Sequence, residues 1–424
     1  MANFMKKLEL LAPAGNILKM RTALSSGADA VYLGIPDFSL RVRINDFTLE
    51  SLEEAIKEVH AQNKKVYVTL NIFAHNQHVA LLPPYIKKIR SLKPDGLIIS
   101  DPGVMATVKK IWPEAEIHLS TQANCTNAAA AKFWYDQGVT RVVLGREVTL
   151  NEIKEIHQAV PKLELEYFVH GAMCMAYSGR CFLSKELVDR SGNLGDCAQP
   201  CRWEYSIKAK NHEEEFDLVA ESHGTYLLNS KDLCLLEYLP QLIEAGIVSF
   251  KIEGRAKSVY YQAVVSGIYA RALEFLKTKP SEVAWKKELK YLKSELVGKL
   301  VHRGYTSGFL LGGKAEQNLT SANHLSDFEF CGQVIAPESD FFKPVLKNGE
   351  YALYFQVHNT IKTKDQVEII GAKYDIIKIR PAKIFDAKTG EELLEAHGGG
   401  GSRTALIIVH EKVEALSVLR RKII

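Results

Sequence analysis

Four cysteines gathered in one short stretch are the residues of this 424-residue chain best suited to carry chemistry. The chain has seven cysteines, and the other three are scattered singly. The four gathered residues are Cys174, Cys181, Cys197 and Cys201. Thiols at such spacing can form disulfides, bind a zinc ion or hold an iron–sulfur cluster.

The spacing of the four thiols separates these possibilities only in part. No secretory signal is expected at the N-terminus, so we expect a cytoplasmic protein with reduced thiols rather than disulfides. Cys197 and Cys201 fit one half of a zinc site, whereas six residues separate Cys174 from Cys181, too many for a tight zinc knuckle. An iron–sulfur cluster accepts looser spacing, and Pro200 adds a rigid turn before Cys201. Spacing alone leaves a cluster, zinc and unligated thiols open.

The residues around the cysteines form a longer motif. Residues 170–174 read His-Gly-Ala-Met-Cys, residues 178–184 read Ser-Gly-Arg-Cys-Phe-Leu-Ser, and residues 193–202 read Asn-Leu-Gly-Asp-Cys-Ala-Gln-Pro-Cys-Arg. This motif resembles the signature of the U32 peptidase family, first described as collagenase-like proteases. Several members are iron–sulfur proteins that hydroxylate RNA bases or quinone precursors without molecular oxygen. The most similar branch hydroxylates a tRNA uridine with prephenate.

The resemblance implies a cofactor, a co-substrate and an RNA partner. The cofactor would be an iron–sulfur cluster, expected to be of the 4Fe-4S type, on the four cysteines named above. Prephenate would supply the hydroxyl group, and tRNA would receive it at the wobble uridine. Because prephenate carries two carboxylates, it needs cationic partners, for which we select Arg146, Arg255 and Lys257. Their structural alternative is ion pairing at the rim with Glu147 and Glu253.

Two further residues are candidates for catalysis. His170 opens the cysteine motif and is a candidate for handling protons, or for supporting the group that does. The alternative is a loop histidine that bonds only to backbone. Glu253 is the second candidate, at the end of a predicted strand.

Short apolar runs alternate with helical patterns through the first half of the chain. Such alternation indicates a parallel sheet covered on both faces. Eight strands favour a (β/α)8-like barrel; a doubly wound sheet is the alternative, but no Gly-x-Gly-x-x-Gly turn follows the first strand. The predicted strands are residues 8–12, 30–34, 65–71, 96–100, 116–120, 141–145, 164–169 and 249–253, and the predicted helices include residues 16–26, 49–62, 103–111, 127–137 and 150–158.

Functional groups of such barrels lie where the strands end. The cysteine stretch follows the seventh predicted strand, so we expect residues 171–225 to be a cysteine-rich insertion at that rim. We therefore predict a barrel domain at 1–258, a helical connection at 259–299 and a small C-terminal antiparallel β-barrel domain at 300–424. Short strand-like runs separated by turn signals support the last of these.

Composition excludes little beyond a membrane protein. No apolar run approaches the length of a membrane span. The net charge of +4 is too small to indicate RNA binding by itself, although residues 277–293 could form a local basic patch or simply a solvated helix face. The oligomeric state is not predicted.

Three rival functions remain beside tRNA hydroxylation. A collagenase-like peptidase would need a nucleophile or a metal-activated water, yet the chain has no His-Glu-x-x-His and no Gly-x-Ser-x-Gly. Hydroxylation of ribosomal RNA or of a quinone precursor is the second. An RNA-binding module with structural zinc is the third.

Overall fold

The structure is a computed structural model. It describes residues 8–35, 38–40, 46–174, 176–203, 229–313, 316–318, 324–398 and 403–423, together with the backbone of strands β8 (Ile207–Lys208) and β9 (Glu215–Phe216). Most of residues 204–228, in the later part of the predicted cysteine-rich insertion, lie outside this set. The chain divides into two compact units. Unit 1 holds residues 1–20, 29–256 and 302–324, and unit 2 holds the rest.

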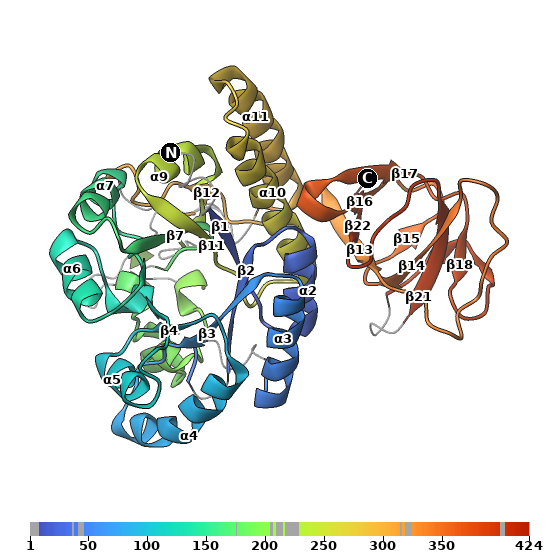
Figure 1. The fold of residues 1–424 in the computed structure, drawn as a ribbon. Helices are drawn as coiled ribbons and strands as arrows, with labels where there is room; N and C mark the ends of the chain where they lie inside the picture. Colours follow the sequence, from blue (N-terminus) through green and yellow to red (C-terminus); the bar gives the residue numbers. More distant parts are fainter. Residues whose placement is uncertain are drawn as a thin grey trace. The chain divides into compact units, whose positions relative to one another are not determined.

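Unit 1 contains a closed barrel of eight parallel strands, which confirms the predicted fold (Figure 1). The barrel closes because β11 pairs with both β1 and β7, so that Phe250 lies opposite Leu10 on one side and Tyr167 on the other. Its strands are β1 (Glu9–Pro13), β2 (Ala30–Gly34), β3 (Lys65–Leu70), β4 (Gly96–Ile99), β5 (Ile117–Leu119), β6 (Arg141–Val143), β7 (Glu164–Ala172) and β11 (Ile247–Ile252).

Helices alternate with these strands because apolar residues recur at helical spacing between them. In α3, for example, Leu52, Ile56 and Val59 are buried, and Thr48 caps the helix by accepting the Ser51 N–H. The helices between barrel strands are α2 (Ile17–Ser25), α3 (Leu49–Ala61), α4 (Asn76–Leu92), α5 (Pro102–Ile111), α6 (Ala128–Asp136), α7 (Leu150–Ala159), α8 (Leu183–Val188) and α9 (Leu239–Glu244).

Beyond the barrel, two short strands extend the end of β7. Strand β10 (Asp232–Cys234) runs antiparallel to it, with Cys234 opposite His170. Strand β12 (Tyr305–Thr306) then pairs with β10. Strand β10 therefore pairs with the last residues of β7. The cysteine segment, by which we mean residues 173–203 with the four gathered cysteines, begins directly after them.

Unit 2 combines two long helices with a curled antiparallel sheet, which agrees with the predicted C-terminal β domain. The helices are α10 (Val259–Lys277) and α11 (Glu282–Lys299). The sheet order is β17-β16-β22-β13-β14-β21-β18-β19, and β15 pairs separately with β20. The strands of unit 2 are β13 (Phe328–Val334), β14 (Tyr351–Val357), β15 (Ile361–Lys362), β16 (Val367–Ile370), β17 (Ile376–Ile379), β18 (Ile384–Asp386), β19 (Glu392–Leu393), β20 (Glu395–Ala396), β21 (Thr404–Val409) and β22 (Val418–Lys422).

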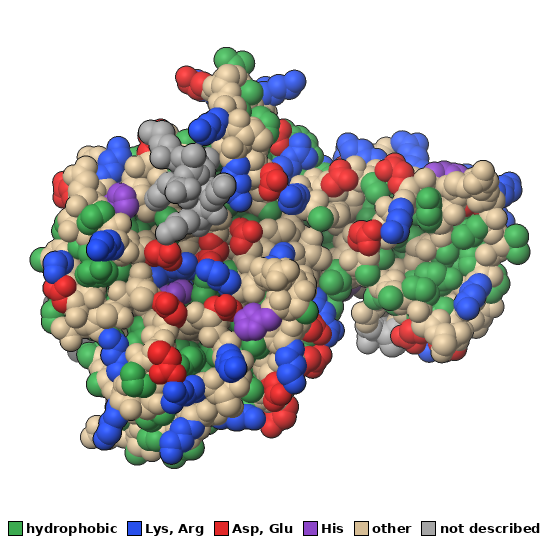
Figure 2. Space-filling model, viewed as in Figure 1, with side chains coloured by type: hydrophobic (Ala, Val, Ile, Leu, Met, Phe, Trp, Pro, Cys, Tyr) green, Lys and Arg blue, Asp and Glu red, His purple; other side chains and the backbone are tan. Residues whose placement is uncertain are grey.

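None of the described helices is long and apolar enough to cross a membrane. On the face seen in Figure 2, Lys and Arg side chains are interspersed with Asp and Glu over the barrel. This mixture matches the small net charge of +4.

Candidate functional site

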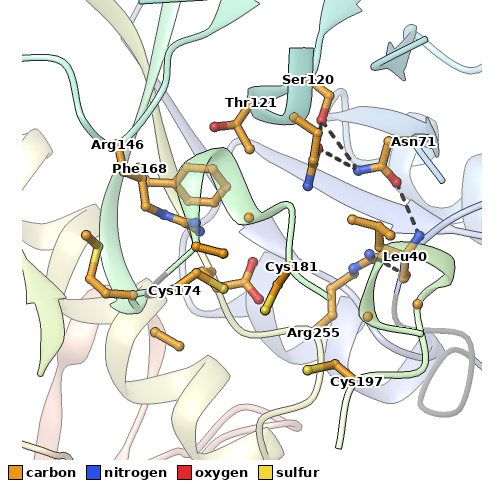
Figure 3. A pocket seen from close by; sticks show the side chains of 18 of the residues that line it. Leu40, Asn71, Ser120, Thr121, Arg146, Phe168, Cys174, Cys181, Cys197 and Arg255 are labelled. Atoms are coloured by element: carbon orange, nitrogen blue, oxygen red, sulfur yellow. Dashed lines mark hydrogen bonds between the residues drawn. The ribbon is translucent and has the colours of Figure 1, made fainter. Parts of the chain in front are cut away.

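A cavity of about 150 Å³ lies at the carboxyl ends of the barrel strands. Its walls come from strand ends on one side and from the cysteine segment on the other, as Figure 3 shows for ten labelled residues. Strand ends from around the barrel contribute Tyr32, Thr69, Asn71, Ser120, Arg146, Phe168, Lys251, Glu253 and Arg255. Such strand ends are where barrel enzymes place their functional groups.

All four gathered cysteines line this one cavity. In Figure 3 the side chains of Cys174 and Cys181 lie between Arg146 and Arg255, and the side chain of Cys197 lies below Arg255. Cys174 follows strand β7, and Cys201 lies in the short 3-10 helix η5 (Pro200–Arg202). None of the seven cysteines, all of which the structure describes, forms a disulfide.

Backbone N–H groups point at two of the sulfur atoms. The Leu183 N–H donates to Cys181 Sγ at 3.4 Å, and the Gln199 N–H donates to Cys197 Sγ at 3.3 Å. Gln199 adopts a left-handed conformation, with φ of 60°, and this forms part of the turn around Cys197. Hydrogen bonds to sulfur tune iron–sulfur centres.

Buried polar side chains hold the cysteine segment in place. Ser178 donates its backbone N–H to Glu147 at 2.7 Å and its hydroxyl to Asn124 at 2.7 Å. The Asn193 side chain accepts the Cys181 N–H at 3.0 Å. Glu147 is thus bound to the segment, and Arg146 forms no ion pair with any residue that the structure describes.

The cavity raises the pKa of Cys201. Burial is the main cause, and the neighbouring Cys174 and Cys197 thiols add to it, whereas Arg202 and Arg303 oppose it. Thiols that affect one another in this way share one electrostatic environment. Within the described ranges, no three His, Cys, Asp or Glu side chains surround a point where a single metal ion could sit.

Four cations line the cavity beside the thiols: Arg202 from the cysteine segment, and Arg146, Lys251 and Arg255 from the strand ends. The last three have defined contacts. The Arg146 guanidinium lies over the Phe168 ring, 3.9 Å from its centroid (Figure 3). Arg255 donates to the Leu40 carbonyl at 2.6 Å and to Thr69 Oγ1 at 3.4 Å. Lys251 lies 4.4 Å from the centroid of the Tyr32 ring. Aromatic faces and fixed acceptors hold these cations in defined positions.

Lys251 is anchored from inside the barrel. Its ammonium binds Glu166 at 2.7 Å, and Ser249 connects Glu166 to Glu9 at 3.1 and 3.0 Å. Arg141 pairs with Glu9 at 2.5 Å, so buried positive and negative charges alternate. Burial lowers the pKa of Lys251, and the Glu166 carboxylate only partly offsets this.

Glu253 is the acidic residue that lines the cavity beside these cations. The Tyr32 hydroxyl lies 3.3 Å from Glu253 Oε2 and donates to the Ile252 carbonyl at 2.9 Å. Burial, and then the charge of Glu253, raise the pKa of Tyr32 well above its ordinary value. Tyr32 therefore stays protonated and can donate to the carboxylate.

Of the residues selected from the sequence, two do not line the cavity. His170 is buried, its ring lies 5.5 Å from that of Tyr305, and its carbonyl accepts the Glu253 N–H at 2.8 Å. Lys257 belongs to unit 2, where its ammonium lies 5.5 Å from the centroid of the Tyr261 ring. The others line it: Arg146, Glu253, Arg255, Cys174, Cys181, Cys197 and Cys201.

The structure adds residues that were not selected from the sequence. Tyr32 and Lys251 lie within the predicted strands 30–34 and 249–253, and nothing near them in the sequence marks them as residues of the site. From the sequence, Phe168 is an ordinary apolar residue of a strand. The contact of its ring with the Arg146 guanidinium becomes visible only in the closed barrel. Position within the barrel, more than residue type, identifies these three.

The fold and the cavity define a class of protein: a parallel barrel whose carboxyl-end cavity is lined by four thiols and four cations. A family model described as Peptidase family U32 matches residues 15–320 of this chain. The chain belongs to that family.

Three curated relatives illustrate what this chain is similar to. The tRNA hydroxylation protein P of Escherichia coli is 41% identical over 346 residues, which cover 72% of this chain and 75% of that protein. The tRNA hydroxylation protein P1 of Bacillus subtilis is 36% identical over 390 residues, covering 92% of this chain and 89% of the relative. A protein named collagenase from Porphyromonas gingivalis is 33% identical over 315 residues, covering 72% and 73%.

Proposed function

We propose that this protein is an iron–sulfur enzyme that hydroxylates a uridine of tRNA at the wobble position, with prephenate as the hydroxyl donor. The cluster, expected to be of the 4Fe-4S type, would be held by Cys174, Cys181, Cys197 and Cys201. The single observation that carries the proposal is that all four thiols share one cavity with Arg146, Lys251 and Arg255.

The thiols suit a cluster better than a zinc ion. Six residues separate Cys174 from Cys181, which is too many for a tight zinc knuckle. Thiolates at the corners of a cluster lie farther apart, and they accept hydrogen bonds such as those from Leu183 and Gln199. When bound, an iron–sulfur cluster supplies electron-transfer and Lewis-acid chemistry.

The cations provide sites for an anionic donor. Arg146 and Arg255 flank the thiols, and a guanidinium binds a carboxylate through two parallel hydrogen bonds. Lys251 contributes a third positive charge from the barrel interior. A dicarboxylate such as prephenate would thus be held beside the cysteines, with Glu253 and Tyr32 placed to hold a proton at the same site.

We propose a tRNA uridine as the acceptor of the hydroxyl group, from the names of the relatives and the position of the cavity. Relatives named tRNA hydroxylation protein are 41% and 36% identical to this chain, and the second alignment covers 92% of it. An enzyme that modifies a base must take that base out of its stack and into a pocket. We place this base at the cavity between the strand ends and the cysteine segment.

The peptidase alternative finds little support in the described residues. A cysteine peptidase pairs its nucleophile with a histidine. The nearest candidate in sequence, His170, is not among the residues that line the cavity and instead contacts the ring of Tyr305.

Protein purified without oxygen should be brown and should contain iron and acid-labile sulfide. Four reduced thiols in one cavity are the reason for this expectation. Iron, sulfide and zinc should be measured on the same sample after anaerobic reconstitution. Stoichiometric zinc with no iron would remove the cluster from the account.

A further inference from the structure

A second hollow opens directly beside the cysteine-lined cavity. This groove has a volume of about 380 Å³. It shares four lining residues with the cavity, namely Leu40, Asn71, Gln122 and Gly179. The two spaces are therefore separated by a wall only one residue thick. A chain molecule with one unit in the cavity would place its next unit in the groove.

The groove presents aromatic rings that the fold keeps partly in solvent. Phe73 is 45% exposed, yet its backbone N–H donates to the Asn193 carbonyl at 3.0 Å and its ring contacts that of His75. Trp134 comes from helix α6 and is only half-buried. Exposed and well-positioned aromatic rings are the platforms on which proteins stack unpaired bases.

A cation and several amides complete the groove. Arg180 is exposed and forms no ion pair with any residue in the described part of the chain. Asn71 is fixed in the shared wall, where its amide nitrogen lies 3.4 Å from Ser120 Oγ and its oxygen accepts the Leu40 N–H at 3.3 Å (Figure 3). Arginine suits a phosphate, and amides suit the edges of bases.

One carboxylate also lines the groove, but it is engaged elsewhere. Asp101 caps helix α5 and accepts the Val104 N–H at 3.0 Å. At a helix N-terminus its negative charge is partly compensated by the helix dipole. It therefore opposes an anionic ligand less than a free carboxylate would.

We propose that this groove binds the nucleotide adjacent to the target uridine, with its base stacked on Phe73 and its phosphate near Arg180. This inference rests on the proposed function. Beyond that function, the inference assigns to the groove a binding site for single-stranded RNA. A base that enters the cavity leaves its neighbours unstacked. A stacking platform one residue away compensates for that loss.

The test is the affinity of the cluster-loaded protein for a hairpin RNA whose single-stranded loop contains uridine. Phe73→Ala should weaken binding roughly 5- to 100-fold, the range expected for losing one stacked base. Phe133→Ala is the matched control, since Phe133 is 55% exposed and contacts Trp134 but does not line the groove. It should bind the hairpin as the wild type does.

A second variant tests the phosphate contact. Arg180→Gln should also weaken binding, and the slope of log affinity against log salt should become shallower by about 0.7, the value for one phosphate contact on a single strand. Iron content, read from the visible spectrum, should be unchanged in both variants.

Each contrary outcome has a separate meaning. If the wild type binds the hairpin and both variants bind it equally well, the groove proposal is overturned and the proposed function stands. If the wild type binds no RNA, the groove proposal and the proposed function are both overturned. If Phe73→Ala weakens binding of a gelatin peptide but not of RNA, the groove belongs to a protein ligand and the RNA proposal is wrong.

Discussion

Replacement of Cys197 by serine should abolish hydroxylation of tRNA while the protein stays folded. Cys197 lines the cavity, and its sulfur accepts the Gln199 N–H at 3.3 Å. Serine keeps the shape but exchanges a soft thiolate for a hydroxyl that ligates iron poorly. Removing a residue that only hydrogen-bonds to a metal ligand already lowers metal affinity or activity by about 10–100-fold. Loss of the ligand itself should therefore reduce the rate of hydroxylation by about 100-fold or more.

Cys234→Ser provides the matched control for this variant. Cys234 is a half-buried cysteine in strand β10 that forms no disulfide and lies outside the cavity lining. It should retain iron and activity. Hydroxyuridine formation, iron content, circular dichroism and gelatin cleavage should be measured on the same preparations. Gelatin cleavage by the wild type and Cys197→Ser alike, with undiminished hydroxylation by the variant, would refute the account and favour a peptidase.

Loss of the Arg255 side chain should weaken binding of prephenate roughly tenfold or more. A charge-assisted hydrogen bond contributes about 1.5–3 kcal/mol, which corresponds to that factor. Arg255 lines the cavity on the flank opposite Arg146 (Figure 3). Equilibrium binding of prephenate to wild type and Arg255→Ala, with the visible spectrum as a check on the cluster, measures the effect.

Two further variants separate charge from structure at this position. Arg255 also binds Thr69 and the Leu40 carbonyl, so its removal could loosen the cavity wall. Thr69→Val removes one of these contacts and keeps the cation, and it should have a smaller effect. Lys257→Ala removes a cation that does not line the cavity, and it should bind prephenate normally. Unchanged binding in Arg255→Ala would take this residue out of the donor site.

The barrel could be predicted from the sequence because its signals are local. Each barrel strand is a short apolar run, and β1 and β2 are buried along their whole length. Helix α4 was not among the helices named from the sequence. Its interior contains Pro83 and Pro84, and proline normally marks the end of a helix, which hides the helical pattern.

The candidate site could be predicted where chain order decides position. Arg146, Glu253 and Arg255 follow strands, and parallel strands bring their ends to one rim, so these residues line the cavity. His170 also lies near a strand end, but β7 continues to Ala172 and pairs there with β10. That pairing joins distant segments, and nothing near His170 in the sequence indicates it.

The buried charges beneath the cavity depend on contacts between distant parts of the chain. Glu9, Glu166 and Lys251 lie on three different strands and meet only because β11 closes the barrel between β1 and β7. Read singly, each is a charged residue in an apolar run. The support of Lys251 could be found only from the folded chain.

The most direct test of the central claim is the hydroxyuridine content of tRNA from cells that lack this gene. The cells should be grown without oxygen, so that no oxygen-dependent enzyme can supply the same modification, and nucleosides should be quantified by mass spectrometry. We predict that hydroxyuridine disappears, that wild type and Cys234→Ser restore it, and that Cys197→Ser does not. Normal hydroxyuridine in the deletion cells, or its restoration by Cys197→Ser, would contradict the account.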